Sequence, residues 1–269
     1  MTIENIEIIG TAGQKLSARL DLPDDGQPVA YALLAHCFTC SKDVKALYHI
    51  ARALTRQRIG ALRFDFTGLG ESGGDFADTS LATNVQDLVA AAESLAARFE
   101  APKLLIGHSF GGAAVIAAAA AMDSCKAVVT IAAPADPRHV AQTLGPAAET
   151  IAARGEAAVQ IAGRTFTLRK RFLDDLRGLD PEDLLFHLNR ALLVMHSPRD
   201  EVVGIENASR IFQAARHPKS FVSLDTADHL LSDPADARYA GSVIAAWAMR
   251  YIAPPEEADA PEAWPTKET

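Results

Sequence analysis

The chain has 269 residues, 49% of them hydrophobic, which is enough for one large α/β domain with a sizeable core or for two small domains. The formal net charge is -8, and the absence of any block of lysine and arginine argues against a nucleic-acid-binding protein. No basic segment followed by an apolar one opens the chain, and the longest apolar run, 113–122, is too short to span a bilayer. We therefore expect a cytoplasmic protein without membrane or nucleic-acid partners.

The predicted elements open with a hairpin and then alternate between strands and helices. Strands are predicted from apolar runs and from alternating apolar residues at 3–9, 15–22, 29–35, 60–66, 103–107, 127–133, 191–197 and 220–225. Helices are predicted at 44–57, 81–99, 110–122, 205–215 and 235–252. This alternation predicts a mostly parallel sheet that is covered by helices on both faces.

The alternation is interrupted over residues 134–189, where short helical patterns surround a possible hairpin at 158–168. This insertion follows a strand at its carboxyl end, the edge at which ligands bind in such sheets, so we predict that it forms a cap over the site. A structural extension without a binding role is the alternative. We assign residues 1–252 to a single domain and 253–269, rich in Pro, Glu and Ala, to a flexible tail.

The turn Gly107-His108-Ser109-Phe110-Gly111 joins a predicted strand to a predicted helix. This is the G-x-S-x-G pattern in a strand–turn–helix context, which exposes a serine hydroxyl on a strained turn. The two glycines leave room for the close approach of strand and helix. Ser109 is therefore the predicted nucleophile, and the backbone N–H of Phe110, at the start of the helix, is a predicted oxyanion-hole donor.

A serine nucleophile needs a base, and the base needs an orienting carboxylate. Among eight histidines, His229 follows the last predicted strand at the carboxyl edge of the sheet, and it is the predicted base. His108 is expected to face away from the serine, and His196 is expected to be a core histidine. Asp200, which follows the strand before the last, is the predicted acid, and Asp136 is the alternative.

The second oxyanion donor of this architecture comes from the loop after the strand at 29–35. We predict that the backbone N–H of Phe38 supplies it, with the Phe38 side chain lining the pocket beside Phe110. A Phe38 that is simply a core aromatic residue is the alternative.

Cys37 and Cys40 have the C-x-x-C spacing that is typical of redox pairs and metal sites. A metal site would need two more ligands, and no nearby pair of cysteines or histidines supplies them. With Cys125, three cysteines do not predict a disulfide framework. An oxidised pair beside the oxyanion loop would be placed to modulate activity, and this redox role is kept as an alternative.

The turn around Ser109 and the chain order serine, aspartate, histidine resemble the α/β-hydrolase superfamily over residues 1–252. Two further stretches resemble a narrower group, whose serine hydrolase domain is often fused to an OsmC-type peroxidase-like domain. These stretches are His36-Cys37-Phe38-Thr39-Cys40-Ser41-Lys42-Asp43 and Arg63-Phe64-Asp65-Phe66-Thr67-Gly68-Leu69-Gly70-Glu71-Ser72-Gly73-Gly74. The resemblance implies an α/β-hydrolase fold with a small helical cap, and it implies that Asp65 bonds the glycine loop behind it. No OsmC-like region follows residue 252, so we expect a free-standing relative or the hydrolase half of a fusion.

These residues predict a serine hydrolase, specifically a carboxylesterase for small acyl or aryl esters that works without a metal or organic cofactor. The same groups would serve a thioesterase, a peptidase or a cofactor-free perhydrolase. A different hypothesis is a non-catalytic or redox-modulated partner of an OsmC-type peroxidase. Apolar residues of the cap suggest an apolar substrate part or, alternatively, the cap's own packing; they are Leu144, Ile151, Phe166, Phe172, Leu173 and Leu176.

Overall fold

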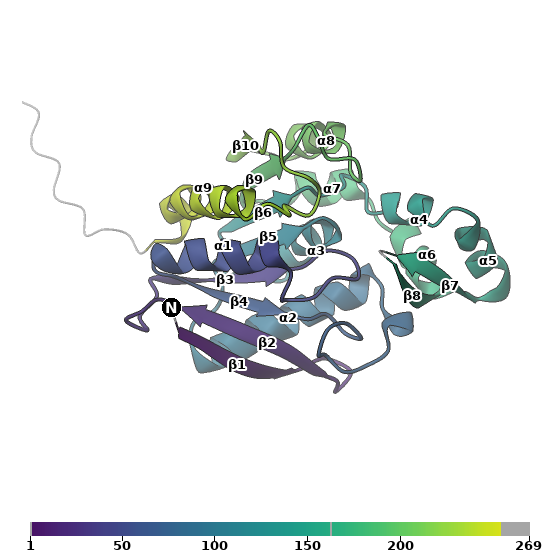
Figure 1. Cartoon of the computed structure of the whole chain (residues 1–269), viewed down its shortest axis with the longest axis horizontal. Helices are drawn as coiled ribbons and strands as arrows, with labels where there is room; N and C mark the ends of the chain where they lie inside the picture. The colour runs from purple at the N-terminus through teal and green to yellow at the C-terminus, as the bar shows by residue number, and fades with distance from the viewer. Residues whose placement is uncertain (1, 162, 254–269) are drawn as a thin grey trace, which may run out of the picture.

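An eight-stranded sheet forms the centre of the molecule, with the strand order β1-β2-β4-β3-β5-β6-β9-β10 (Figure 1). The structure, a computed structural model, describes residues 2–161 and 163–253. The strand bounds are β1 Thr2–Ile9, β2 Lys15–Leu22, β3 Ala30–Ala35, β4 Ile59–Phe64, β5 Leu104–His108, β6 Ala127–Ile131, β9 Ala191–His196 and β10 Lys219–Ser223. β2 runs antiparallel to β1 and to β4, and the remaining neighbours are parallel. The predicted mostly parallel sheet is confirmed.

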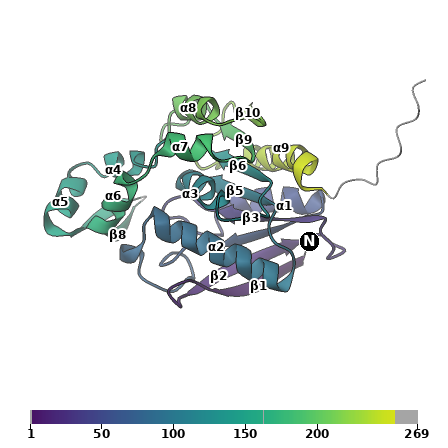
Figure 2. The same cartoon turned by 180° about the vertical axis from the view of Figure 1, so that it is seen from behind.

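Helices cover both faces of this sheet (Figures 1 and 2). One face carries α1 (Lys45–Arg56) and α9 (Pro234–Ile252), and the other carries α2 (Leu81–Arg98), α3 (Phe110–Ala119) and α8 (Glu206–Ala214). β3, β5, β6 and β9 are buried along their whole length, because each is covered on both faces. This is why their sequences are nearly continuous apolar runs.

β4, β6, β10 and α3 end two or three residues earlier than the sequence predicts. β4 ends at Phe64, and the N–H of Phe66 donates to Nε2 of His36 at 3.2 Å instead of extending the strand. α3 ends at Ala119, because the N–H groups that follow bond to carbonyls three residues back, in a tighter turn. α2 begins at Leu81 with the side chain of Ser80 as its cap.

The segment between β6 and β9 forms a cap beyond the carboxyl ends of the strands, on the right in Figure 1. Its elements are α4 His139–Thr143, α5 Pro146–Arg154, β7 Glu156–Ile161, β8 Arg164–Arg169, α6 Lys170–Arg177 and α7 Pro181–Phe186. β7 and β8 pair antiparallel and form the predicted hairpin, although residue 162 of its turn lies outside the described residues.

The apolar residues that the sequence singles out in the cap belong to the main core. Ile151, Phe166, Phe172, Leu173 and Leu176 are buried there, and residue 144 packs against it. Their first role is therefore packing between cap and sheet. The predicted tail, apart from residue 253, lies outside the described residues. No helix within the described ranges is long and apolar enough to cross a bilayer.

Candidate active site

The turn between β5 and α3 holds Ser109 in a strained conformation, with φ 54° and ψ -122°. Such a conformation costs a residue other than glycine about 1–3 kcal/mol and is typical of functional sites. The neighbouring glycines make the turn possible. A Cβ on Gly111 would lie 2.5 Å from the carbonyl oxygen of His36, and a Cβ on Gly107 would overlap the backbone of Gly111. The G-x-S-x-G spacing is therefore a steric requirement of this turn.

Three predicted site residues meet at the carboxyl edge of the sheet. Nε2 of His229 lies 3.0 Å from Oγ of Ser109, and Nδ1 of His229 lies 2.8 Å from Oδ2 of Asp200. Ser109 follows β5, Asp200 follows β9 and His229 follows β10. His229 is 120 positions from Ser109 and 29 positions from Asp200 in the chain, and the three residues form one hydrogen-bonded series.

The surroundings of Asp200 keep its carboxylate ionised. Burial alone would raise its pKa, but hydrogen bonds from His196, from His229 and from the Val203 N–H outweigh burial and hold the pKa well below the usual range. Oδ1 accepts the N–H groups of Val202 and Val203, both at 2.9 Å, which leaves Oδ2 facing His229. A carboxylate only accepts hydrogen bonds, so Nδ1 of His229 carries the proton and Nε2 presents a lone pair to the Ser109 hydroxyl.

The alternative acid, Asp136, has different neighbours. Its carboxylate pairs with the Arg138 guanidinium, with Oδ2 and Nη2 2.7 Å apart, and it also accepts the Arg138 N–H at 2.9 Å. Burial would raise its pKa, but these bonds to Arg138 outweigh burial and lower it. The structure brings Asp200, and not Asp136, to His229.

Phe38 lies in the loop that follows β3. Its ring centroid is 5.3 Å from that of Phe110 and 5.4 Å from that of Phe172 in the cap. The predicted donor loop, the first turn of α3 and the cap therefore meet at these three rings. The half-buried Phe38 ring packs against the core, as its structural alternative requires.

Comparisons with known proteins identify the family to which this fold belongs. Residues 32–267 match the Alpha/beta hydrolase family. This chain belongs to the alpha/beta hydrolase family. The predicted fold, with its mostly parallel sheet flanked by helices, is confirmed. No match was found among functionally curated proteins.

Solved structures extend this family assignment. The esterase domain of a Rhodothermus marinus protein is 53% identical, covers 94% of this chain and 100% of its own, and has a TM-score of 0.78. Est1E from Butyrivibrio proteoclasticus, solved with ferulic acid, is 22% identical over 91% of this chain and 98% of its own, with a TM-score of 0.79. Mouse alpha/beta hydrolase domain-containing protein 10 is 17% identical over 92% of this chain and 99% of its own, with a TM-score of 0.74. These matches support the hydrolase part of the resemblance and give no support to the OsmC fusion.

Cys37 and Cys40 form a disulfide, which is the oxidised state of the pair that the sequence analysis kept as an alternative. The two residues close a tight turn, in which the Cys40 N–H donates to the Cys37 carbonyl at 3.1 Å and the Cα atoms are 5.3 Å apart. Such a separation suits a disulfide. The bridge encloses Phe38, so it restrains the predicted donor loop. Cys125 is buried and free, and among the described residues no cluster of metal-ligating side chains occurs.

His108 lies beside the loop that carries the predicted base. Its ring lies 5.3 Å from the ring of His229, and its Nε2 donates to the His229 carbonyl oxygen at 2.7 Å. His196 is a core histidine as expected, but its Nε2 also lies 3.4 Å from Oδ2 of Asp200. The position of both histidines at the carboxyl ends of their strands was a signal available in the sequence.

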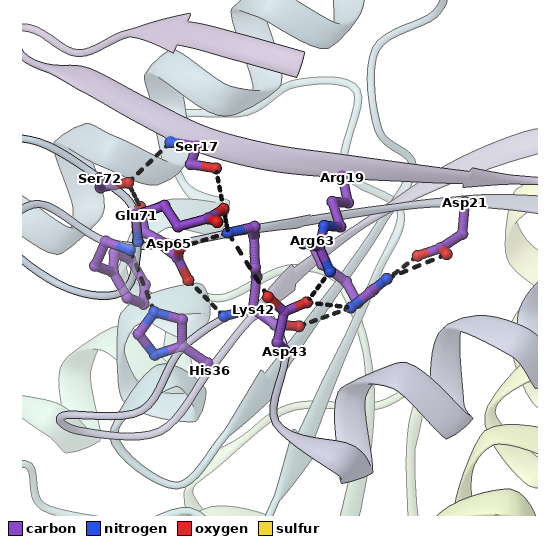
Figure 3. A network of polar contacts seen from close by, with 11 residues as sticks. Ser17, Arg19, Asp21, His36, Lys42, Asp43, Arg63, Asp65, Glu71 and Ser72 are labelled. Atoms are coloured by element: carbon purple, nitrogen blue, oxygen red, sulfur yellow. Dashed lines mark hydrogen bonds and ion pairs between the residues drawn. The ribbon is translucent and has the colours of Figure 1, made fainter. Parts of the chain in front are cut away.

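A buried network of charges holds the loop that carries Phe38 (Figure 3). The Lys42 ammonium lies 2.7 Å from Asp65 and 2.6 Å from Glu71, and the Lys42 N–H donates to Asp65 at 2.6 Å. Arg63 donates to the Lys42 carbonyl at 2.8 Å and to Asp21 at 2.7 Å. Asp65 also accepts the Glu71 N–H at 2.9 Å, in agreement with the expected bonding of the glycine loop. Backbone and side chain of Lys42 are thus both fixed.

Replacing Lys42 with methionine is expected to destabilise the fold by about 3–5 kcal/mol, because the buried Asp65 carboxylate loses its cation. Burial alone would lower the pKa of Lys42, but its hydrogen bonds to Asp65 and Glu71 outweigh burial and raise the pKa, so the lysine is charged in the native protein. Urea unfolding at pH 7 measures the loss. Glu71→Gln, at the exposed end of the network, is the control and should destabilise the fold much less. Equal stability of Lys42→Met and wild type would contradict this account.

Two buried histidines should make the fold sensitive to mild acid. Burial lowers the pKa of His36 and of His108 to about 4 in each case, and for His108 the nearby His229 adds to the effect. Between pH 6.5 and 4 the unfolded chain therefore binds protons that the folded chain does not. The contribution of these histidines to the free energy of unfolding is fully present above pH 6.5. It declines as the pH falls, by about 2 kcal/mol per histidine between pH 7 and pH 5.

Urea unfolding at both pH values tests this expectation. His108→Gln, which removes one of the two imidazoles, should show a smaller loss between pH 7 and pH 5 than the wild type. An identical loss in the two proteins would show that His108 has no depressed pKa.

Proposed function

We propose that this protein is a serine hydrolase, most specifically a carboxylesterase that cleaves small acyl or aryl esters through an acyl-enzyme on Ser109. The observation that carries the proposal is the series Ser109–His229–Asp200, with separations of 3.0 and 2.8 Å at the carboxyl edge of the sheet. A hydroxyl, an imidazole and an ionised carboxylate in this order are suited to acyl transfer. The 53% identity to an esterase domain supports the ester class.

In the proposed reaction, Oγ of Ser109 attacks the ester carbonyl carbon while Nε2 of His229 takes the hydroxyl proton. Asp200 holds the ring of His229 and stabilises the imidazolium that forms. The carbonyl oxygen becomes an oxyanion, which the N–H groups of Phe110 and Phe38 bind. The intermediate collapses, and His229 returns the proton to the departing alcohol. Water, deprotonated by His229, then releases the acid and restores Ser109.

The rings around Ser109 suggest the acyl preference. Phe38, Phe110 and Phe172 have centroids within 6.0 Å of one another, and Phe38 is half-buried. An apolar or aryl acyl group would contact these rings more favourably than a charged one. A thioester or a peptide would use the same three residues, so these substrates remain alternatives within the proposal. The hypothesis of an OsmC-type partner gains no support from the comparisons.

A matched set of substrates tests the proposed class. Purified protein is given a p-nitrophenyl ester, a thiophenyl ester and a p-nitroanilide of one and the same acyl group. We expect kcat/KM to be highest for the oxygen ester, with the anilide cleaved slowest. Turnover of the thioester without turnover of the ester would assign a thioesterase instead, and fast anilide cleavage would assign a peptidase.

A further inference from the structure

Two buried histidines outside the proposed catalytic series share one geometry. His108 is the last residue of β5 and His196 is the last residue of β9, and their exposed fractions are 1% and 0%. Nε2 of His108 lies 2.7 Å from the carbonyl oxygen of His229, and Nε2 of His196 lies 2.7 Å from the carbonyl oxygen of Val203. Each imidazole thus binds the backbone of a loop that carries a member of the series.

These contacts fix the tautomer of both rings. A carbonyl oxygen only accepts, so Nε2 of His108 and Nε2 of His196 each carry the proton, and each Nδ1 carries a lone pair. Both Nδ1 atoms are buried without a hydrogen-bond partner. Burial and the nearby His229 lower the pKa of His108 to about 4, so this ring is neutral at physiological pH.

The two bonds act on the base and on the acid separately. His108 holds the peptide group of His229 itself. His196 holds Val203, whose N–H binds Oδ1 of Asp200, and its Nε2 is also 3.4 Å from Oδ2. Both loops are irregular segments after strands, so these bonds restrict where the base and the acid can lie. Errors of about 1 Å in such positions lower turnover strongly.

Stability alone does not account for imidazoles at these places. A buried acceptor without a partner is unfavourable, because it has lost its hydration and gained no bond. The apolar neighbours of both strands would accommodate an unbranched apolar side chain without this penalty. Histidine supplies an Nε2–H that reaches the loop, and an apolar side chain has no such donor.

We infer that His108 and His196 are positioning residues, which tie the loop of the base and the loop of the acid to the ends of β5 and β9. The inference rests on the proposed function, since it gives these bonds a role in turnover. Alternation along the strands places the two rings on opposite faces of the sheet, because residues 104 and 106 pack in one core and residues 192 and 194 in the other. The two ties therefore reach the same hydrogen-bonded series from opposite faces of the sheet.

Substitution by methionine and by glutamine separates the hydrogen bond from the packing at each site. Glutamine keeps an N–H near the position of Nε2, whereas methionine has a similar length and no donor. His108→Met and His196→Met are each expected to lower kcat about 10-fold, because each variant loses one hydrogen bond that positions a loop. KM should stay within about 2-fold of wild type. The double methionine variant should lose more kcat than either single variant. The glutamine variants should recover most of kcat.

Thermal unfolding and a surface control complete the test. Each methionine variant removes the unpaired Nδ1 but leaves a loop carbonyl without its donor, so it should unfold close to the wild-type temperature. His187→Met, on the exposed end of α7, should keep full activity. Wild-type kcat in the methionine variants would overturn the inference, as would a loss of kcat that follows a lowered unfolding temperature and is not restored by glutamine. An active Ser109→Ala protein would overturn the proposed function and this inference together, whereas an inactive Ser109→Ala with active methionine variants would overturn this inference alone.

Discussion

Ser109→Ala is expected to lower kcat for p-nitrophenyl ester hydrolysis by about 10⁴-fold or more, because no other hydroxyl can form the acyl-enzyme. Nε2 of His229, 3.0 Å from the serine oxygen, would then have only water to activate. KM should change little, since alanine leaves the proposed acyl-binding rings and the proposed oxyanion donors in place. Initial rates with a p-nitrophenyl ester of a short acid measure the effect.

Ser209→Ala provides the matched control for this substitution. Ser209 lies on the exposed side of α8, so the same loss of a hydroxyl there should leave turnover unchanged. Thermal unfolding of both variants establishes that the fold is intact. A Ser109→Ala protein with wild-type kcat would show that Ser109 is not the nucleophile.

Asp200→Asn is expected to lower kcat by about 10⁴-fold while the fold is retained. The N–H groups of Val202 and Val203 would hold the amide oxygen at the place of Oδ1, and this turns the amide NH₂ toward His229. Nδ1 of His229 must then accept a hydrogen bond, so its proton moves to Nε2. The lone pair that should take the Ser109 proton is lost.

Asp136→Asn tests whether any carboxylate at this edge of the sheet would show the same effect. Asp136 follows β6 and pairs with Arg138, so its amide variant should keep kcat within about 2-fold of wild type, as is usual for a partly exposed ion pair. Steady-state rates of the two amide variants, measured side by side, decide between the residues. Comparable losses in both would mean that Asp200 has no special role.

Much of the fold could be predicted because local patterns decide it. The apolar run 127–133 predicts a strand, and β6, Ala127–Ile131, is buried along its whole length. The glycines around Ser109 are required by contacts within one turn and with the adjacent strand. Knowing that parallel strands end at one edge was enough to expect Asp200 and His229 near Ser109. These inferences need only the order of the elements and the direction of the strands.

What could not be predicted depends on contacts between segments far apart in the chain. The direction of the His108 side chain becomes meaningful only when the loop of His229, 121 residues later, folds back over it. The pairing of Lys42 with Asp65 joins residues 23 positions apart, and that of Arg63 with Asp21 joins residues 42 apart. A sequence shows each charged residue but not its partner. In the folded protein these residues must pair, because burying an unpaired charge is costly.

The Cys37–Cys40 bridge stayed one of several alternatives for another reason. A C-x-x-C spacing is compatible with a free pair, a metal site or a disulfide, and the choice depends on the turn conformation. Here the turn brings the Cα atoms to 5.3 Å, with Thr39 at a positive φ of 63°. No residue in the sequence fixes that turn as the glycines fix the turn at Ser109.

Covalent labelling tests the central claim most directly. The protein is treated with a fluorophosphonate, and intact-mass and peptide mass spectrometry locate the adduct. The account predicts a single phosphonyl group on Ser109, formed in the wild type, absent from Ser109→Ala and formed much more slowly in Asp200→Asn. An unlabelled wild-type protein, or an adduct on any other residue, would contradict it.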